Sequence, residues 1–209
     1  MKKGLLLMVL MSLVLTGHAQ TDKGNHFLGF GTAIGVGENE GLMGLAFSRS
    51  KIKDGNTTVS ETKLTSLFIT TKAGYFIADN LAAGLDLAGS FSSGSTDVAS
   101  LNLESQNSFI GIGPFVRYYF PTGRIFPFAE VNTLFGNSNQ SITGQGVDVE
   151  NKYAVSNFGG GLGLAFFLGE KSSLDLGLNY NSTSLNEKGT DIKNRQNTLG
   201  LRLSFTIYL

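Results

Sequence analysis

The chain has 209 residues, and its 28 glycines are nearly double the usual share of ~7%. It carries 16 basic and 16 acidic side chains and no cysteine. The basic surplus that a nucleic-acid binder uses against phosphates is missing, so nucleic acid is not an expected partner. The lack of cysteine excludes disulfides, thiolate zinc sites and iron–sulfur clusters.

The first 19 residues have the pattern of a secretory signal peptide. Two lysines precede an apolar run over residues 5–15, and a small-x-small cleavage site follows at residues 17–19. The apolar run is about half the ~20 residues that a membrane-spanning helix needs. We therefore predict cleavage after Ala19 and a single exported domain over residues 20–209.

Two candidate strands come next, at residues 26–36 and 42–52. Leu28, Phe30, Ile34 and Val36 share one face of the first, and Met43, Leu45 and Phe47 share one face of the second. The stretch 38–41, with two glutamates and a glycine, separates them. One unbroken strand across both would be too long for a bilayer. Either segment can therefore supply the first transmembrane strand.

Seven further strands are predicted from the alternation of large apolar residues with small or polar ones and from the strict alternation of short and long connections between them. The clearest case is Leu199 to Leu209, where every odd position is Leu, Phe or Ile. The predicted ranges are 62–77, 81–91, 106–120, 125–136, 153–168, 173–182 and 197–209. Short connections at 78–80, 121–124 and 169–172 alternate with long polar stretches at 51–63, 92–106, 137–152 and 183–196.

Two all-β architectures produce this alternation. A soluble lipocalin-like barrel points its apolar face inward, whereas an outer-membrane barrel points it to lipid and keeps small and polar residues inside. The second face here is mostly Gly, Ser, Thr and Asn, and the strands are longer than the ~5–6 residues usual in soluble sheets. We predict an antiparallel up-and-down transmembrane β-barrel in the bacterial outer membrane, with short periplasmic turns and long extracellular loops. Such barrels have an even number of strands, so eight are expected and ten are the alternative.

Six charged side chains fall on the inward phase of the predicted strands. They are Lys72, Asp86, Arg117, Glu130, Asp175 and Arg202. The interior of an eight-stranded barrel is only wide enough for side chains, so unpaired charges there would be strongly desolvated. We predict a buried salt-bridge network that blocks ion flow. Solvated charges in a narrow wet pore are the alternative, because many inward glycines would thin the filling.

Aromatic residues gather near the short turns, where a girdle at the periplasmic membrane boundary is expected. They are Phe76, Tyr118, Tyr119, Phe120, Phe126, Phe128, Phe166, Phe167 and Tyr208. The predicted mature domain has a single histidine, His26, at the periplasmic end, and the glycine run 159–163 lies inside a strand with no helix after it. Neither pattern indicates catalysis or nucleotide binding, so no enzyme activity, metal or cofactor is expected.

Four segments resemble the small outer-membrane β-barrel proteins common in Bacteroidetes, which are similar in plan to the eight-stranded OmpA and OmpX barrels. They are KGNHFLGFG from Lys23, GYFIADNLAAGL from Gly74, PFVRYYFPTGRIFPFAEV from Pro114, and the terminal run. The resemblance implies contact with outer-membrane lipid and a C-terminal signal for the barrel-assembly machinery. That signal would comprise Leu201, Leu203, Phe205, Ile207 and Leu209. Such barrels usually end in Phe, and this one departs from them by ending in Leu.

The leading functional hypothesis is a monomeric, non-enzymatic barrel that supports the outer membrane and displays polar loops to an unknown extracellular ligand. A narrow porin-like channel, or a channel for small hydrophobic solutes, is the alternative. A soluble secreted lipocalin-like binder is the second alternative.

Overall fold

The computed structural model describes residues 20–36, 46–54, 57–98, 101–123, 125–144, 146–188 and 193–209. The predicted signal peptide and the stretch 38–41 lie outside these ranges. The elements are β1 (His26–Val36), β2 (Ala46–Asp54), β3 (Thr57–Ala78), β4 (Leu81–Val98), β5 (Leu101–Tyr119), β6 (Ile125–Gly144), β7 (Val147–Phe167), β8 (Ser172–Glu187) and β9 (Lys193–Tyr208). No helix capable of crossing a membrane occurs among the described residues.

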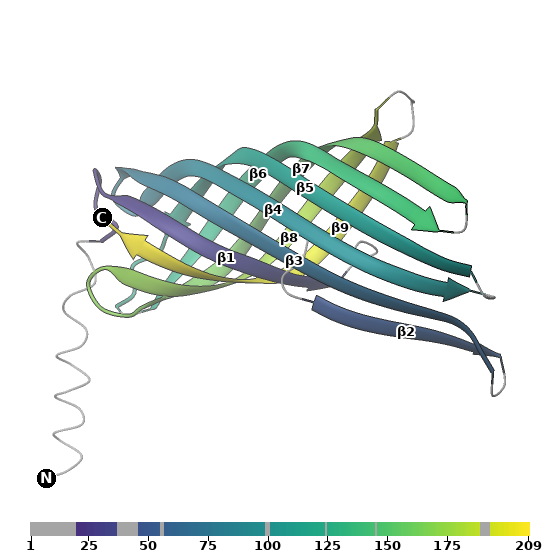
Figure 1. Ribbon diagram of the computed structural model, residues 1–209. Coiled ribbons are helices and arrows are strands. Elements are labelled where there is room, and N and C mark those ends of the chain that lie inside the picture. The colour runs from purple at the N-terminus through teal and green to yellow at the C-terminus, as the bar shows by residue number, and fades with distance from the viewer. Residues whose placement is uncertain are drawn as a thin grey trace, which may run out of the picture.

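Eight of these strands, β1 and β3 to β9, close into a ring (Figure 1). Each strand from β3 to β9 pairs antiparallel with the next along the chain, and β1 pairs with both β9 and β3. Phe27 of β1, for example, lies opposite Tyr208 on one side and Gly74 on the other. The predicted eight-stranded up-and-down barrel is confirmed, and the ten-stranded alternative is wrong.

The first barrel strand is the segment 26–36. Strand β2, which contains most of the other candidate, pairs only with the outer part of β3, from Ala46 opposite Ser66 to Asp54 opposite Thr57. This is possible because β3 has 22 residues and β1 only 11, so β3 continues beyond the point where β1 accompanies it. Both candidates therefore form strands, but one of them lies outside the ring.

The polar stretches that were expected to be long loops are mostly strand. Residues 92–98 end β4, residues 137–144 end β6, and residues 147–152 begin β7. Their Ser, Thr and Asn residues are common in turns, but pairing with a neighbouring strand outweighs this local preference. The barrel wall thus continues as a polar sheet well past the ~9–11 residues that cross a bilayer.

The short turns, the start of β1 and the end of β9 all lie at one end of the molecule (Figure 1). Leu209 N donates to His26 O at 2.8 Å, which ties the last residue to the first strand. The turns use Asn80, Gly123 and Gly169, all with positive φ. In outer-membrane barrels the short turns face the periplasm, so this end is called the periplasmic end and the opposite one, with the polar sheet, the outer end.

The outward face carries the large apolar side chains. Leu162 of β7, Leu178 of β8 and Leu201 of β9 lie side by side in register and are 68%, 51% and 53% exposed. A continuous apolar belt of this kind is unstable in water and matches the hydrocarbon layer of a membrane. The inward face holds the charged, aromatic and amide side chains described next.

Candidate functional site in the barrel lumen

The structure brings the six charged residues of the inward phase together in the middle of the lumen, each on a different strand. Lys72 Nζ lies 2.6 Å from Asp86 Oδ1 and 3.2 Å from Glu130 Oε1. Arg117 places Nε 2.7 Å from Glu130 Oε2 and Nη1 2.6 Å from Asp175 Oδ2. Arg202 Nη1 lies 2.8 Å from Glu130 Oε1. Glu130 therefore contacts all three cations of this charge network.

The charge network links opposite walls of the barrel. Lys72 and Asp86 are direct neighbours on β3 and β4, as are Arg117 and Glu130 on β5 and β6. The pair between Arg117 and Asp175 instead crosses the lumen from β5 to β8. Because three positive charges face three negative ones, the buried cluster is electrically balanced, as desolvated ions require.

Hydroxyl groups complete the coordination of these charges. Ser173 Oγ donates to Asp175 Oδ1 at 2.6 Å, and Thr206 Oγ1 donates to Asp175 Oδ2 at 3.2 Å. Arg117 Nη1 also donates to Tyr119 OH at 2.9 Å. The sequence reasoning missed these partners, although each lies on the inward phase of its strand, two or four residues from a predicted charge.

An aromatic layer fills the lumen between the charge network and the short turns. Its fully or almost fully buried members are Phe27, Phe76, Phe115, Tyr119, Phe126, Phe128 and Tyr208. Two rings lie directly against the cations: Lys72 Nζ is 3.5 Å from the centre of the Phe115 ring, and Arg117 Cζ is 4.2 Å from that of Phe128. Cation–π contacts of this kind are strongest where water is excluded.

This layer corrects the predicted aromatic girdle. Phe76, Tyr119, Phe126, Phe128 and Tyr208 point into the lumen rather than toward lipid. Successive side chains of a strand face opposite sides, so neighbours such as Tyr118 and Tyr119 cannot both contact the membrane. Tyr118 and Phe120, at 41% and 46% exposed, remain on the outward face.

Gly163 shows how an inward glycine beside the aromatic layer is compensated in the filling of the lumen. A Cβ at this position would collide with the ring of Phe128 and approach Leu176 O to 2.6 Å. The missing side chain is therefore replaced by an aromatic ring from the neighbouring strand, an arrangement that protects glycine backbone within sheets. Glycine here permits closer packing.

The segment before β1 crosses the periplasmic end beneath the aromatic layer. Thr21 is 1% exposed, and its hydroxyl donates to Asn80 Oδ1 at 2.7 Å. Gln20 Nε2 donates to Gly169 O at 2.9 Å, and Gly24 N donates to Phe76 O at 2.9 Å. These bonds attach the segment to two of the short turns and to the end of β3.

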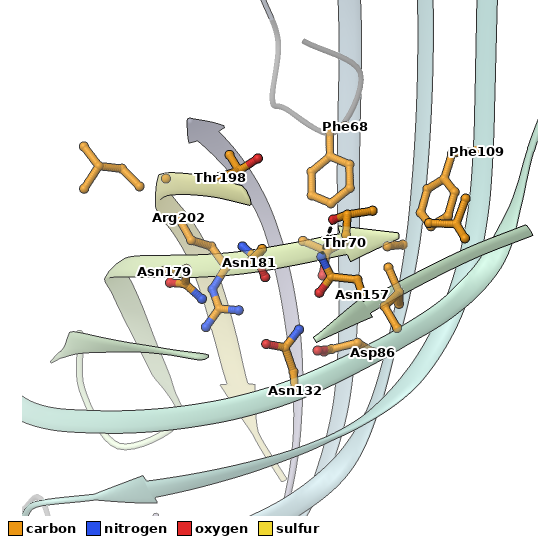
Figure 2. Close-up of a pocket in the computed structure, with 16 residues that line it drawn as sticks. Phe68, Thr70, Asp86, Phe109, Asn132, Asn157, Asn179, Asn181, Thr198 and Arg202 are labelled. Atoms are coloured by element: carbon orange, nitrogen blue, oxygen red, sulfur yellow. Dashed lines mark hydrogen bonds between the residues drawn. The ribbon is translucent and has the colours of Figure 1, made fainter. Parts of the chain in front are cut away.

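A cavity of about 110 Å³ occupies the outer half of the lumen, beyond the charge network (Figure 2). Asn132, Asn157, Asn179 and Asn181 line one side, and Arg202 lies among them. Phe68 and Phe109 lie toward the other side. Sequence patterns did not predict this cavity, because its lining residues come from seven strands.

The remaining candidates occupy ordinary positions in the barrel wall. His26 is exposed at the periplasmic end, its ring 4.9 Å from that of Tyr75, and the glycine run 159–163 lies inside β7. Among the described residues, no group of three or more His, Cys, Asp or Glu side chains is placed to hold a metal. The residues of the expected assembly signal lie on β9, or directly after it in the case of Leu209, and Leu201, Leu203, Phe205 and Leu209 are exposed on the outward face.

These features define a class of protein: a closed eight-stranded barrel with a lipid-facing belt and a packed lumen. A family model described as outer membrane protein beta-barrel domain matches residues 8–205. The chain therefore belongs to this family and resides in the bacterial outer membrane, in contact with its lipid. The soluble lipocalin-like alternative is wrong, because the apolar face that it would bury meets lipid.

Comparison with solved structures finds small outer-membrane proteins. Neisserial surface protein A is 16% identical, with 87% of this chain and 96% of that one covered and a TM-score of 0.47. Ail, the attachment invasion locus protein of Yersinia pestis, is 12% identical, with 90% of this chain and 99% of that one covered and a TM-score of 0.47. OprG from Pseudomonas aeruginosa is 13% identical, with 91% of this chain and 98% of that one covered and a TM-score of 0.44. Similarity at this level says nothing about function, and no curated protein sequence matches the chain.

Proposed function

We propose that this protein is a non-enzymatic, non-conducting barrel that supports the outer membrane and displays its polar outer sheet to an extracellular ligand. The observation that carries the proposal is the filling of the inner lumen. The side chains of Glu130, Arg117 and Asp175 are at most 1% exposed, and the aromatic layer lies directly beneath them.

Ion flow through this lumen would require the charge network to open. A passing ion would have to displace Arg117 from Glu130 and Asp175, to which it lies at 2.7 and 2.6 Å. It would then have to part the rings of Phe76, Tyr119 and Tyr208. Breaking a buried ion pair costs several kcal/mol, which favours a closed barrel over the alternative of a narrow channel.

Conductance in planar lipid bilayers tests the closed barrel. The protein, shown to be folded by its boiling-dependent shift in gel mobility, is expected to give no current steps above the lipid baseline. A general porin inserted under the same conditions serves as the positive control. Reproducible steps from the folded protein would support the narrow channel and contradict the proposal.

Display of the polar sheet can be tested because the chain has no cysteine. A single cysteine at Asn139, exposed in the outer part of β6, should react on intact cells with a maleimide that cannot cross the outer membrane. The matched variant Asp79→Cys lies in a short turn and should react only after lysis. The opposite labelling pattern would place the polar sheet in the periplasm.

We also propose a route to the membrane. The chain is exported by cleavage after Ala19, assembled through recognition of its last strand, and remains a monomer of the Bacteroidetes type that the sequence resembles. Support comes from the outward apolar positions of β9, which pairs with β1 to close the ring. Because such barrels usually end in Phe, Leu209→Phe should strengthen the assembly signal and raise the fraction of folded protein recovered from cells. Recognition through this strand would be contradicted if neither Leu209→Phe nor Leu203→Ala changed the folded fraction.

A further inference from the structure

The outer cavity has two unlike walls, one apolar and one made of amides (Figure 2). The apolar wall is formed by Phe68, Ala88, Phe109, Leu134 and Val155. The amide wall is formed by Asn132, Asn157, Asn179 and Asn181, with Thr183 and Thr198 beside them. A pocket with an apolar side and a few convergent polar groups is typical of small-molecule sites.

Three polar atoms on this cavity have no hydrogen-bond partner among the described residues. They are Asn132 Oδ1, Asn179 Oδ1 and Arg202 Nη2, and Asn179 is only 7% exposed. Arg202 uses its other terminal nitrogen, Nη1, on Glu130. Buried polar atoms are seldom left unpaired, so an occupant of the cavity should supply at least two donors and one acceptor.

The glycine run of β7 makes room for the amide wall. A Cβ at Gly159 would collide with Asn181 Oδ1 and lie 3.0 Å from Asn132 Oδ1. Any larger residue would therefore push these two amides into the cavity. Glycine at this position keeps the space open and holds two carboxamide groups from β6 and β8 on the same side.

We propose that the cavity binds a small uncharged polyhydroxy molecule, about the size of a single sugar ring. Hydroxyl groups both donate and accept, so one molecule can satisfy the two amide oxygens and the guanidinium nitrogen. Its apolar ring face matches the phenyl rings of Phe68 and Phe109. At a liquid share of about 30 Å³ per water, the volume of about 110 Å³ corresponds to roughly four waters, which an entering ring would displace.

The charges around the cavity argue against an anion. Arg202 is the cation on its lining, but it is already paired with Glu130, and Asp86 also lines the cavity. A carboxylate ligand would therefore meet the Asp86 carboxylate on the same lining, and the charge of the one guanidinium there is already balanced by Glu130. Because the aromatic layer fills the periplasmic end, the ligand must enter from the outer end. This inference goes beyond surface display and does not depend on it.

Binding is tested with the full-length folded protein in lipid nanodiscs, which avoid sugar-headed detergents. Glucose, galactose and N-acetylglucosamine are titrated separately while the side-chain amide signals of asparagine are followed by NMR. At least one sugar should shift these signals in a saturable way. Asn179→Leu should weaken that binding about tenfold, whereas Asn139→Leu, on the exposed outer sheet, should leave it unchanged.

A second variant guards against misfolding of the first. Gly159→Ala narrows the cavity without touching the charge network and should reduce binding while the boiling-dependent gel shift persists. Absence of saturable binding by all three sugars would mean that the cavity holds only water and would overturn the proposal. It would equally be overturned if decanoate bound in place of the sugars, or if Asn179→Leu bound as tightly as the unmodified protein.

Discussion

Replacing Arg117 by methionine removes one buried charge and retains most of the side-chain volume. Arg117 contacts Glu130, Asp175 and Tyr119 at 2.7, 2.6 and 2.9 Å. In the variant, Glu130 keeps Lys72 and Arg202. Asp175 keeps only hydroxyl partners, and the balanced cluster acquires one excess negative charge. The change therefore isolates the electrostatic contribution of a single cation.

The expected cost is about 3–5 kcal/mol of unfolding free energy, the usual penalty when a buried charge loses its partner. No reduction for solvent screening applies, because the Arg117 and Asp175 side chains are each 1% exposed. The double variant Arg117→Met/Asp175→Asn restores charge balance. It should be clearly more stable than the single variant, since the two sites are directly coupled.

The assay must suit a chain without tryptophan. Urea unfolding in phospholipid vesicles can be followed by circular dichroism and by the gel mobility of unboiled samples. Lys152→Met is the control, because the Lys152 and Glu150 side chains are 57% and 60% exposed and such pairs contribute less than about 1 kcal/mol. A loss for Arg117→Met no larger than that of the control would refute the idea that the network stabilises the barrel.

Two further predictions concern the packing of the wall. Gly163→Ala should cost about 1–3 kcal/mol by overpacking against Phe128, whereas Gly89→Ala, whose nearest neighbour would lie 3.8 Å away, should be neutral in the same unfolding assay. Equal effects of the two glycine variants would contradict the close contact. Leu201→Arg on the lipid face should lower the free energy of unfolding by about 2–4 kcal/mol, and Leu209→Arg at the membrane boundary should lower it by about 0–1 kcal/mol. Equal costs would show that the apolar belt is misplaced.

Strand alternation was sufficient to predict the inward charges. A period of two fixes the face of each residue once any one residue of the strand is placed, so Lys72, Arg117 and Arg202 could be assigned inward without coordinates. The same rule would have placed Tyr119 and Tyr208 inward. Grouping the aromatic residues by their closeness to the turns, rather than by phase, led to the mistaken girdle.

Other features depend on contacts between distant strands and were beyond the reach of local patterns. Strand β2 exists because the outer part of β3 has no partner in β1, and this follows from the relative lengths of strands far apart in the ring. Which inward residues meet across the lumen depends on the tilt and stagger of the whole barrel. The contact of Arg117 with Asp175 and the convergence of four asparagines are of this kind.

The lumen is organised in layers, and their order bears on where the protein acts. Rings fill the periplasmic end, ion pairs cross the middle, and amides line an open volume at the outer end. Ion pairs that join opposite walls lie across the path that ions would follow, as the proposed closed barrel requires. A barrel that must keep its shape while presenting a cavity and a polar sheet outward gains rigidity from the same pairs. The position of the charge network thus separates a stabilised inner half from an outer half in which recognition can take place.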